Sequence, residues 1–113
     1  MKKKLISILA LGIVAGAYCH AEDSGTIDSV AVWTKNCKKC HGSDGSPTKV
    51  GKKFGARDYK DAAVQASFTD EEAIKVTKEG VFEDGKKKMP PYADKLSDEE
   101  IAAVVKLVRS FAK

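Results

Sequence analysis

The sequence is poor in the side chains that most often bind metals or form cross-links. Its 113 residues include three cysteines and two histidines, and neither residue type occurs after His41. A structural zinc site normally needs four Cys or His ligands, so the chain lacks ligands for one. It also lacks, near its cysteine pair, the alternating β-branched residues of a thioredoxin-like βαβ unit. These absences argue against two common uses of paired cysteines.

The only long hydrophobic run stands at the N-terminus. Residues 1–4 are a methionine and three lysines, residues 5–17 form an apolar run of thirteen, and small residues follow. At about 1.5 Å per residue the run would span only ~20 Å, which is short of a bilayer core. The pattern predicts a secretory signal peptide over residues 1–21. No stable membrane insertion is expected.

Two small-residue sites are candidates for cleavage, after Ala17 or after Ala21. We favour Ala21, because cleavage there also removes Cys19, which would otherwise be an unpaired thiol in an exported protein. Lipidation of Cys19 is the alternative, and the bulky Tyr18 directly before it argues against this modification. We therefore predict a periplasmic protein with one mature domain over residues 22–113.

The basic character of the chain comes mostly from the leader. The precursor has 20 basic and 16 acidic residues. Without the three leader lysines, 17 basic and 16 acidic residues remain, a net charge of +1. This balance gives no indication of nucleic-acid binding. A mature chain of 92 residues buries little core on its own, so a bound apolar group would help to fill it.

One motif dominates the mature region, the C-x-x-C-H sequence formed by Cys37, Cys40 and His41. On a helix these positions are i, i+3 and i+4, so two sulfurs and an imidazole share one face. Such a face suits haem, which takes a thioether from each cysteine while the imidazole ligates the iron. A disulfide between the cysteines would leave His41 without a role. We predict one covalent haem c, with His41 as proximal iron ligand.

Met89 is the only methionine after the initiator, and it begins the sequence Met89-Pro90-Pro91-Tyr92. A methionine that only fills a core would more often lie on an apolar helix face. A thioether sulfur is a soft, neutral donor that favours reduced iron and raises its reduction potential. The two prolines stiffen the loop that carries the sulfur. We predict that Met89 is the distal iron ligand.

The segment before the motif, residues 28–36, is expected to be a helix. Asp28 can cap its N-terminus, and Val30, Trp33 and Cys37 fall on one stripe. The helix should therefore run into the motif with Trp33 facing the core.

The segment after the motif, residues 42–56, is rich in Gly, Ser and Lys, and this composition predicts a loop. We expect it to wrap one edge of the haem. We also expect it to give a backbone carbonyl to the second ring nitrogen of His41, because a ligating imidazole is normally oriented by such a partner. Pro47 is close to the histidine in sequence, but the sequence leaves open which carbonyl is used.

Two later segments carry helix-capping signals. Thr69 and Glu72 form a capping box for a helix that should stop at Gly80, and a short helix is expected within residues 58–65. Ser97 begins a second box, for a last helix that should pack against the first near Val30 and Trp33. The apolar stripe of this last helix consists of Ile101, Val104, Val105, Val108 and Phe111. We assign the acidic residues in these caps to helix stabilisation and not to acid/base catalysis, since no nucleophile or base candidate lies beside them.

Taken in order, these features resemble a class I cytochrome c, one of the small monohaem electron carriers of bacterial periplasms. The resemblance covers nearly the whole mature chain, from Trp33 four residues before the first haem cysteine to the C-terminal helix. It implies an all-α fold of three to five short helices around one haem, with the terminal helices in contact. It also implies haem c bound through Cys37 and Cys40, with His41 proximal and Met89 distal.

The chain departs from this family at one position that bears on the site. Many members carry a Gly-Pro pair whose proline carbonyl orients the proximal histidine. This chain has Gly55-Ala56-Arg57 and lacks the pair.

Two classes of function are consistent with these features. The first is an electron carrier that cycles between Fe(III) and Fe(II) with both axial positions filled, so no catalytic residue is expected. The alternative is a haem protein that binds or reduces peroxide or a diatomic gas at an open iron site. Cytochrome c′ bundles carry their motif near the C-terminus and a dihaem peroxidase needs a second motif, so the carrier is favoured.

The charges are distributed unevenly along the chain. Residues 35–60 hold eight basic and two acidic residues and residues 86–88 are all lysine, whereas residues 61–85 hold seven acids and two lysines. Both lysine-rich stretches flank predicted haem ligands. We expect a positive collar around the haem edge that docks weakly on an acidic site of a redox partner protein, with slower association at higher salt. A merely solvated lysine face is the alternative. We expect a monomer.

Overall fold

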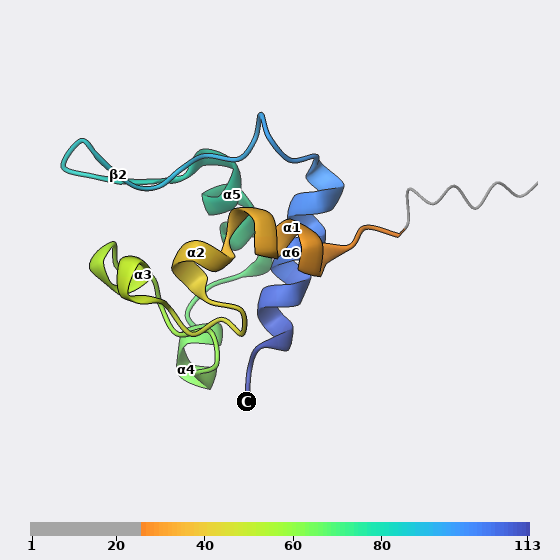
Figure 1. The fold of residues 1–113 in the computed structure, drawn as a ribbon, viewed down its shortest axis with the longest axis horizontal. Coiled ribbons are helices and arrows are strands. Elements are labelled where there is room, and N and C mark those ends of the chain that lie inside the picture. Colours follow the sequence, from red (N-terminus) through yellow and green to blue (C-terminus); the bar gives the residue numbers. More distant parts are fainter. Residues whose placement is uncertain (1–25) are drawn as a thin grey trace, which may run out of the picture.

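The computed structural model describes residues 26–113 (Figure 1). The predicted signal peptide, both cleavage sites and Cys19 lie outside the described residues. The helices are α1 (Ser29–Asn36), α2 (Lys38–His41), α3 (Lys49–Lys53), α4 (Ala62–Gln65), α5 (Asp70–Glu79) and α6 (Asp98–Ser110). A two-stranded antiparallel hairpin is formed by β1 (Val81–Glu83) and β2 (Lys86–Met89). No helix in the described region is long and apolar enough to cross a membrane.

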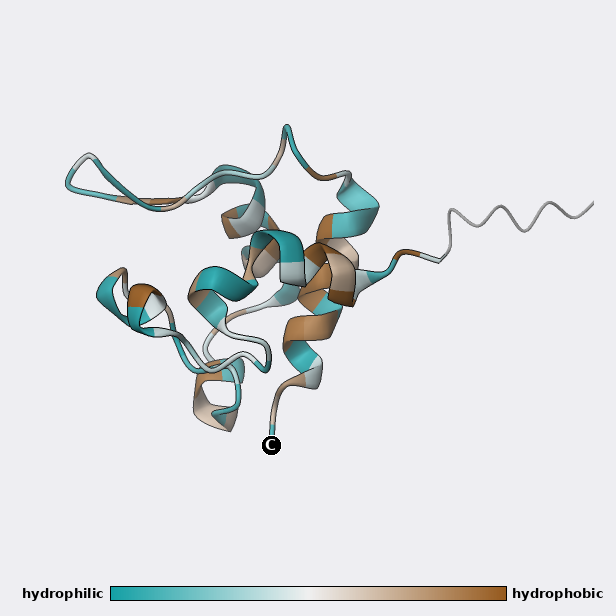
Figure 2. Cartoon of the chain, viewed as in Figure 1, coloured by the Kyte–Doolittle hydropathy of each residue, from teal (hydrophilic) through white to brown (hydrophobic). Residues whose placement is uncertain are grey.

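The first and last helices pack against each other, as expected from the sequence. Trp33 of α1 and Val104 and Val108 of α6 are buried in one cluster, and the Phe111 ring lies 5.1 Å from that of Trp33. Figure 2 shows the strongly hydrophobic residues of α6 where it crosses α1. The expectation for Val30 was wrong, since this side chain is 59% exposed. Val32 packs against the cluster instead.

The caps read from the sequence set the ends of the two longest helices. At α6 the Ser97 hydroxyl accepts from the Glu100 amide and the Glu100 carboxylate accepts from the Ser97 amide, so the capping box is complete. At α5 the Thr69 hydroxyl accepts from the Glu72 amide, and the helix ends before Gly80. The reciprocal bond from Glu72 is not formed, and its side chain faces a cavity instead.

Two local features raise the helix count above the expected three to five. The first helix breaks at Cys37, which separates α1 from α2. The segment expected to be entirely loop contains α3, because the Thr48 hydroxyl accepts from the Gly51 amide and starts a helical turn. The core remains helical, in agreement with the predicted fold class.

A hairpin replaces the loop expected before Met89. Asp84 and Gly85 both have positive φ, 51° and 75°. A turn with positive φ at both central residues matches the right-handed twist of a two-stranded hairpin, and Asp-Gly is a preferred pair for it. As Figure 1 shows, the hairpin and α3 project on the same side of the molecule, away from the α1–α6 crossing.

Candidate functional site

Trp33 braces the cysteine motif from below. Its indole Nε1 donates a 2.8 Å hydrogen bond to the carbonyl of Gly42, the residue directly after the motif. The indole ring is 3% exposed and lies 5.6 Å from the imidazole of His41. One side chain of α1 therefore fixes the far end of the motif while it fills the core.

The segment after the motif folds back tightly on Cys40. The amide of Thr48 donates to the Cys40 carbonyl at 3.0 Å, and its hydroxyl donates to the Lys39 carbonyl at 2.6 Å. A Cβ on Gly51 would lie 1.9 Å from that same Cys40 oxygen, so only glycine fits there. Within residues 42–56, α3 and its cap therefore pack closely against Cys40, and the expected contact with a haem edge stays a prediction.

Met89 ends β2, and its backbone packs against the C-terminus of α5. A Cβ on Gly80 would lie 2.5 Å from the Met89 carbonyl oxygen, and Gly80 also has a positive φ of 75°. Glycine at this position therefore brings the hairpin close to α5. The prolines that follow fix φ at two successive residues and restrict the backbone just after the sulfur-bearing side chain.

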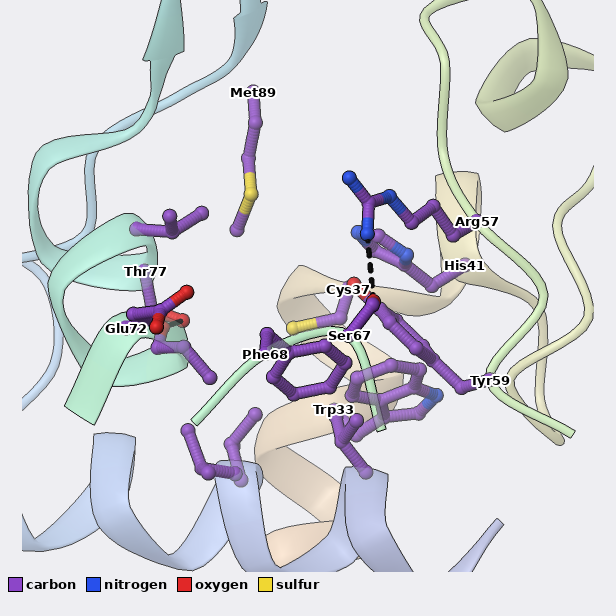
Figure 3. A pocket seen from close by; sticks show the side chains of 15 residues that line it. Trp33, Cys37, His41, Arg57, Tyr59, Ser67, Phe68, Glu72, Thr77 and Met89 are labelled. Carbon is purple, nitrogen blue, oxygen red and sulfur yellow. Dashed lines mark hydrogen bonds between the residues drawn. The ribbon is translucent and has the colours of Figure 1, made fainter. Parts of the chain in front are cut away.

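The four predicted site residues come together around two adjoining cavities of about 240 and 290 Å³. Cys37, His41 and Met89 line both cavities, and Cys40 lines the larger one. Figure 3 shows Met89 entering the smaller cavity from the hairpin side, while His41 points in from the opposite wall and Cys37 lies below. Cavities of roughly 300 Å³ and above are typical of small-molecule and cofactor sites. The sequence therefore identified residues that the fold brings together.

His41 is held between two aromatic rings. The Tyr59 ring stacks on its imidazole, with centroids 5.5 Å apart and planes inclined by 24°, and Trp33 lies on another side. Burial lowers the pKa of His41 below its ordinary value, so the neutral ring is favoured. A neutral imidazole is the form that ligates a metal.

The carbonyl expected to orient His41 is not in place. The Nδ1 atom of His41 is buried and has no hydrogen-bond partner within the described residues. An unpaired buried ring nitrogen is costly in a folded protein. At least one ring nitrogen of His41 therefore needs a partner that the described residues do not supply.

The two cysteines are free thiols, so the structure does not contain the disulfide considered from the sequence. Burial, with a smaller effect from the neighbouring Cys40, raises the pKa of the Cys37 thiol to about 11. Reactive redox dithiols have lowered values instead. The described residues also contain no cluster of three or more His, Cys, Asp or Glu side chains that would hold a metal ion. The dithiol and zinc alternatives are both disfavoured.

Part of the wall of the smaller cavity, close to His41, was not predicted from the sequence. It contains Tyr59, Phe68 and Arg57, and the Arg57 guanidinium donates a 2.9 Å hydrogen bond to the Ser67 hydroxyl (Figure 3). Arg109 of α6 holds this wall in place by donating to the Phe68 carbonyl at 2.7 Å and lying over the Phe68 ring. The sequence could not assign Tyr59 and Phe68 to the site, because neither has a fixed spacing from the C-x-x-C-H motif.

The residues around the cavities fit a haem group. Two free thiols and an imidazole project from consecutive turns, a thioether faces them, and the remaining walls are largely aromatic and aliphatic. The buried His41 imidazole favours its neutral form, which is the form that ligates a metal. Fold and site together define the class of small helical haem proteins with a C-x-x-C-H motif.

Comparisons with known proteins agree with this class. The family model described as cytochrome c oxidase, cbb3-type, subunit III, matches residues 27–108. A solved structure described as KustC0563 c-type cytochrome is 41% identical, with a TM-score of 0.68 over 77% of this chain and all of that one. A tyrosine-to-phenylalanine mutant of the same protein gives the same identity and TM-score, over 75% of this chain and 99% of that one. No curated protein matches.

The chain therefore belongs to this family of c-type cytochrome domains, and it is a small class I-like cytochrome c. Membership implies a haem cofactor and electron transfer through it. The resemblance stated from the sequence, and the all-α fold with its terminal helices in contact, are both confirmed.

Proposed function

We propose that the protein is an exported carrier of single electrons, with one haem c attached covalently to Cys37 and Cys40. His41 and Met89 are its axial iron ligands. The proposal rests mainly on one observation: the His41 imidazole, the Met89 thioether and the Cys37 thiol line the same cavity. When bound, the haem supplies reversible one-electron chemistry between Fe(III) and Fe(II).

The residues of the chain favour a carrier over an enzyme. Met89 ends a strand, its backbone packs against Gly80 and two prolines follow it, so the backbone that carries its sulfur is restricted. A filled axial position leaves no open site for peroxide or a diatomic gas. Little has to rearrange when an electron moves, because both ligands come from fixed elements. The thioether raises the potential by favouring the reduced metal.

The surface around the cavity mouth supports a protein partner with an acidic docking site. The mouth of the larger cavity includes Phe54, next to α3, and Lys88 of β2, whose ammonium lies 5.8 Å from the centre of the Phe54 ring. Seven further lysines lie on α2, α3 and β2, the elements that carry Cys40, Gly51 and Met89 of this cavity: Lys38, Lys39, Lys49, Lys52, Lys53, Lys86 and Lys87. Charges of one sign around an exposed apolar mouth steer association with an oppositely charged partner.

The location rests on the leader. A basic start, a thirteen-residue apolar run and small residues support export to the periplasm and cleavage after Ala21. N-terminal sequencing of the mature protein tests this point. A mature chain that retains the apolar run would contradict it.

A redox titration tests the carrier against the ligand-binding alternative. We expect a reversible one-electron transition, with a Nernst slope of about 59 mV per decade. We also expect the spectrum of the reduced protein to stay unchanged under carbon monoxide, because both axial positions are filled. Binding of carbon monoxide, or turnover of peroxide, would support the alternative instead.

A further inference from the structure

The break between α1 and α2 leaves one carbonyl without its helical partner. The amides of Cys40 and His41 both donate to the Cys37 carbonyl, at 3.2 and 2.9 Å. The carbonyl of Asn36, the last residue of α1, consequently receives no amide from the next helical turn. A partly buried carbonyl in this position needs another donor.

The donor comes from the loop that carries Met89. The Tyr92 hydroxyl donates a 2.9 Å hydrogen bond to the Asn36 carbonyl, across 56 positions of sequence. The Tyr92 ring is only 8% exposed and lines the same cavity as Met89 and Cys40. Among the described residues, this is the hydrogen bond that joins the Met89 loop to the helices of the motif.

The backbone around Tyr92 is anchored elsewhere. Its amide donates to the Thr77 carbonyl of α5 at 3.0 Å, and its own carbonyl accepts from the amides of Lys95 and Leu96. The loop is therefore fastened to α5 by its backbone and to the motif by one side-chain hydroxyl. These two kinds of contact are separable by mutation.

We propose that the Tyr92 hydroxyl is a positioning group that holds the methionine loop closed over the motif. This inference rests on the proposed ligation by Met89. Tyr92 lies three residues after Met89, and the carbonyl it reaches directly precedes Cys37, so one bond links the segments that carry the two axial ligands. Loss of the hydroxyl shifts the loop toward conformations in which the sulfur is away from the iron.

Imidazole binding to the oxidised holoprotein tests the inference, because added imidazole must displace the methionine. The apparent affinity scales with the fraction of molecules whose loop is open. Tyr92→Phe removes one hydrogen bond and keeps the ring, so we expect imidazole to bind about fivefold more tightly, the equivalent of one ordinary hydrogen bond. The weak far-red band of methionine-ligated ferric haem should titrate away at correspondingly lower imidazole concentration.

Ser97→Ala is the matched control for a general loss of stability. It removes the cap of α6, which costs about as much as one hydrogen bond, and Ser97 lines neither cavity. We expect this variant to lose comparable stability against denaturant while its imidazole affinity stays at the parent value. Equal tightening in both variants would overturn the inference, as would parental affinity in Tyr92→Phe.

Measurements on the variant Met89→Ala distinguish the role of the Tyr92 hydroxyl from the proposed ligation by Met89. In Met89→Ala the iron is already open, so adding Tyr92→Phe should change imidazole affinity no further. A fivefold effect that persists there would show that the hydroxyl does not act through Met89, and would overturn the inference. If Met89→Ala alone leaves imidazole affinity unchanged, the proposed ligation fails as well.

Discussion

The α1–α6 crossing and the opposite end of the molecule are built in different ways. At the crossing, Trp33 and Val104 are each 3% exposed. At the other end, Phe54 is 40% exposed and Phe82 is 55% exposed (Figure 1). The two cavities lie between these regions. The chain closes the first region with its own side chains, whereas the second leaves large apolar side chains partly exposed.

This difference separates stability from function. Apolar burial at the crossing stabilises the fold in proportion to the area removed from water. The α3 and hairpin arms bury little, but they carry the Cys40 cradle, Met89 and the lysine surface. Substitutions of buried residues that line neither cavity should lower stability and leave the haem chemistry intact. Substitutions in the second region should change the haem chemistry or partner association and leave the stability of the fold largely unchanged.

The largest expected effect is the loss of haem attachment in the variant Cys37→Ser/Cys40→Ser. Serine forms no thioether, so no haem should remain with the chain after denaturation. A denaturing gel read by haem absorbance measures this, with Lys39→Ala as the control that changes the motif and keeps both sulfurs. Haem that stays on the double variant through denaturation would contradict covalent attachment.

The second prediction concerns the buried face of α6. Ile101 is fully buried and lines neither cavity, so Ile101→Ala should cost about 3 kcal/mol of unfolding free energy. Val30→Ala, at an exposed position of α1, should change it by less than about 0.5 kcal/mol. Denaturant titration measures both. If Ile101→Ala changes the reduction potential as much as a substitution of Met89 does, stability and haem chemistry are not separable in this way.

The third prediction concerns the distal ligand. Met89→Ala should lower the reduction potential by on the order of 0.1 V, well inside the range of about 0.8 V that axial ligands cover. It should also open the iron to added ligands while the haem stays attached. Potentiometry on parent and variant decides the matter, and equal potentials would mean that Met89 is not the ligand.

The smallest effect is expected at the lysine surface. Lys86→Ala/Lys87→Ala should slow association with an acidic redox partner severalfold at low salt and flatten its salt dependence. Lys75→Ala/Lys106→Ala removes the same charge from α5 and α6 and is the matched control. Stopped-flow kinetics at several ionic strengths measure the rates. If the association rate of the parent protein does not depend on ionic strength, the lysine surface is not an electrostatic docking site.

The parts of the fold that the sequence predicted well are those fixed by local chemistry. Thr69 and Gly80 bound α5, and Ser97 with Glu100 starts α6, because caps act within one helical turn. The sequence also singled out the four residues that line the cavities together, since motif spacing relates three of them and Met89 is the only internal methionine, while their role as haem ligands stays a prediction.

The parts that were missed depend on distant contacts or on weak local signals. The Asp84-Gly85 pair is a turn signal in the sequence. The residues on either side of it are mostly charged, so they do not show the apolar alternation that indicates a strand. Val30 fits the helical stripe and is nevertheless exposed, because α6 covers a neighbouring face. The bond between Tyr92 and Asn36 joins residues 56 positions apart, so no local pattern could reveal it.

The most direct test of the account is the visible absorption spectrum of the purified mature protein, oxidised and then reduced. The account predicts a low-spin c-type spectrum, with the weak far-red band that ferric haem shows only when methionine sulfur is bound. Met89 is the only methionine of residues 22–113, so that band would identify it as the ligand. A protein without haem, or with high-spin haem and no such band, would contradict the central claim.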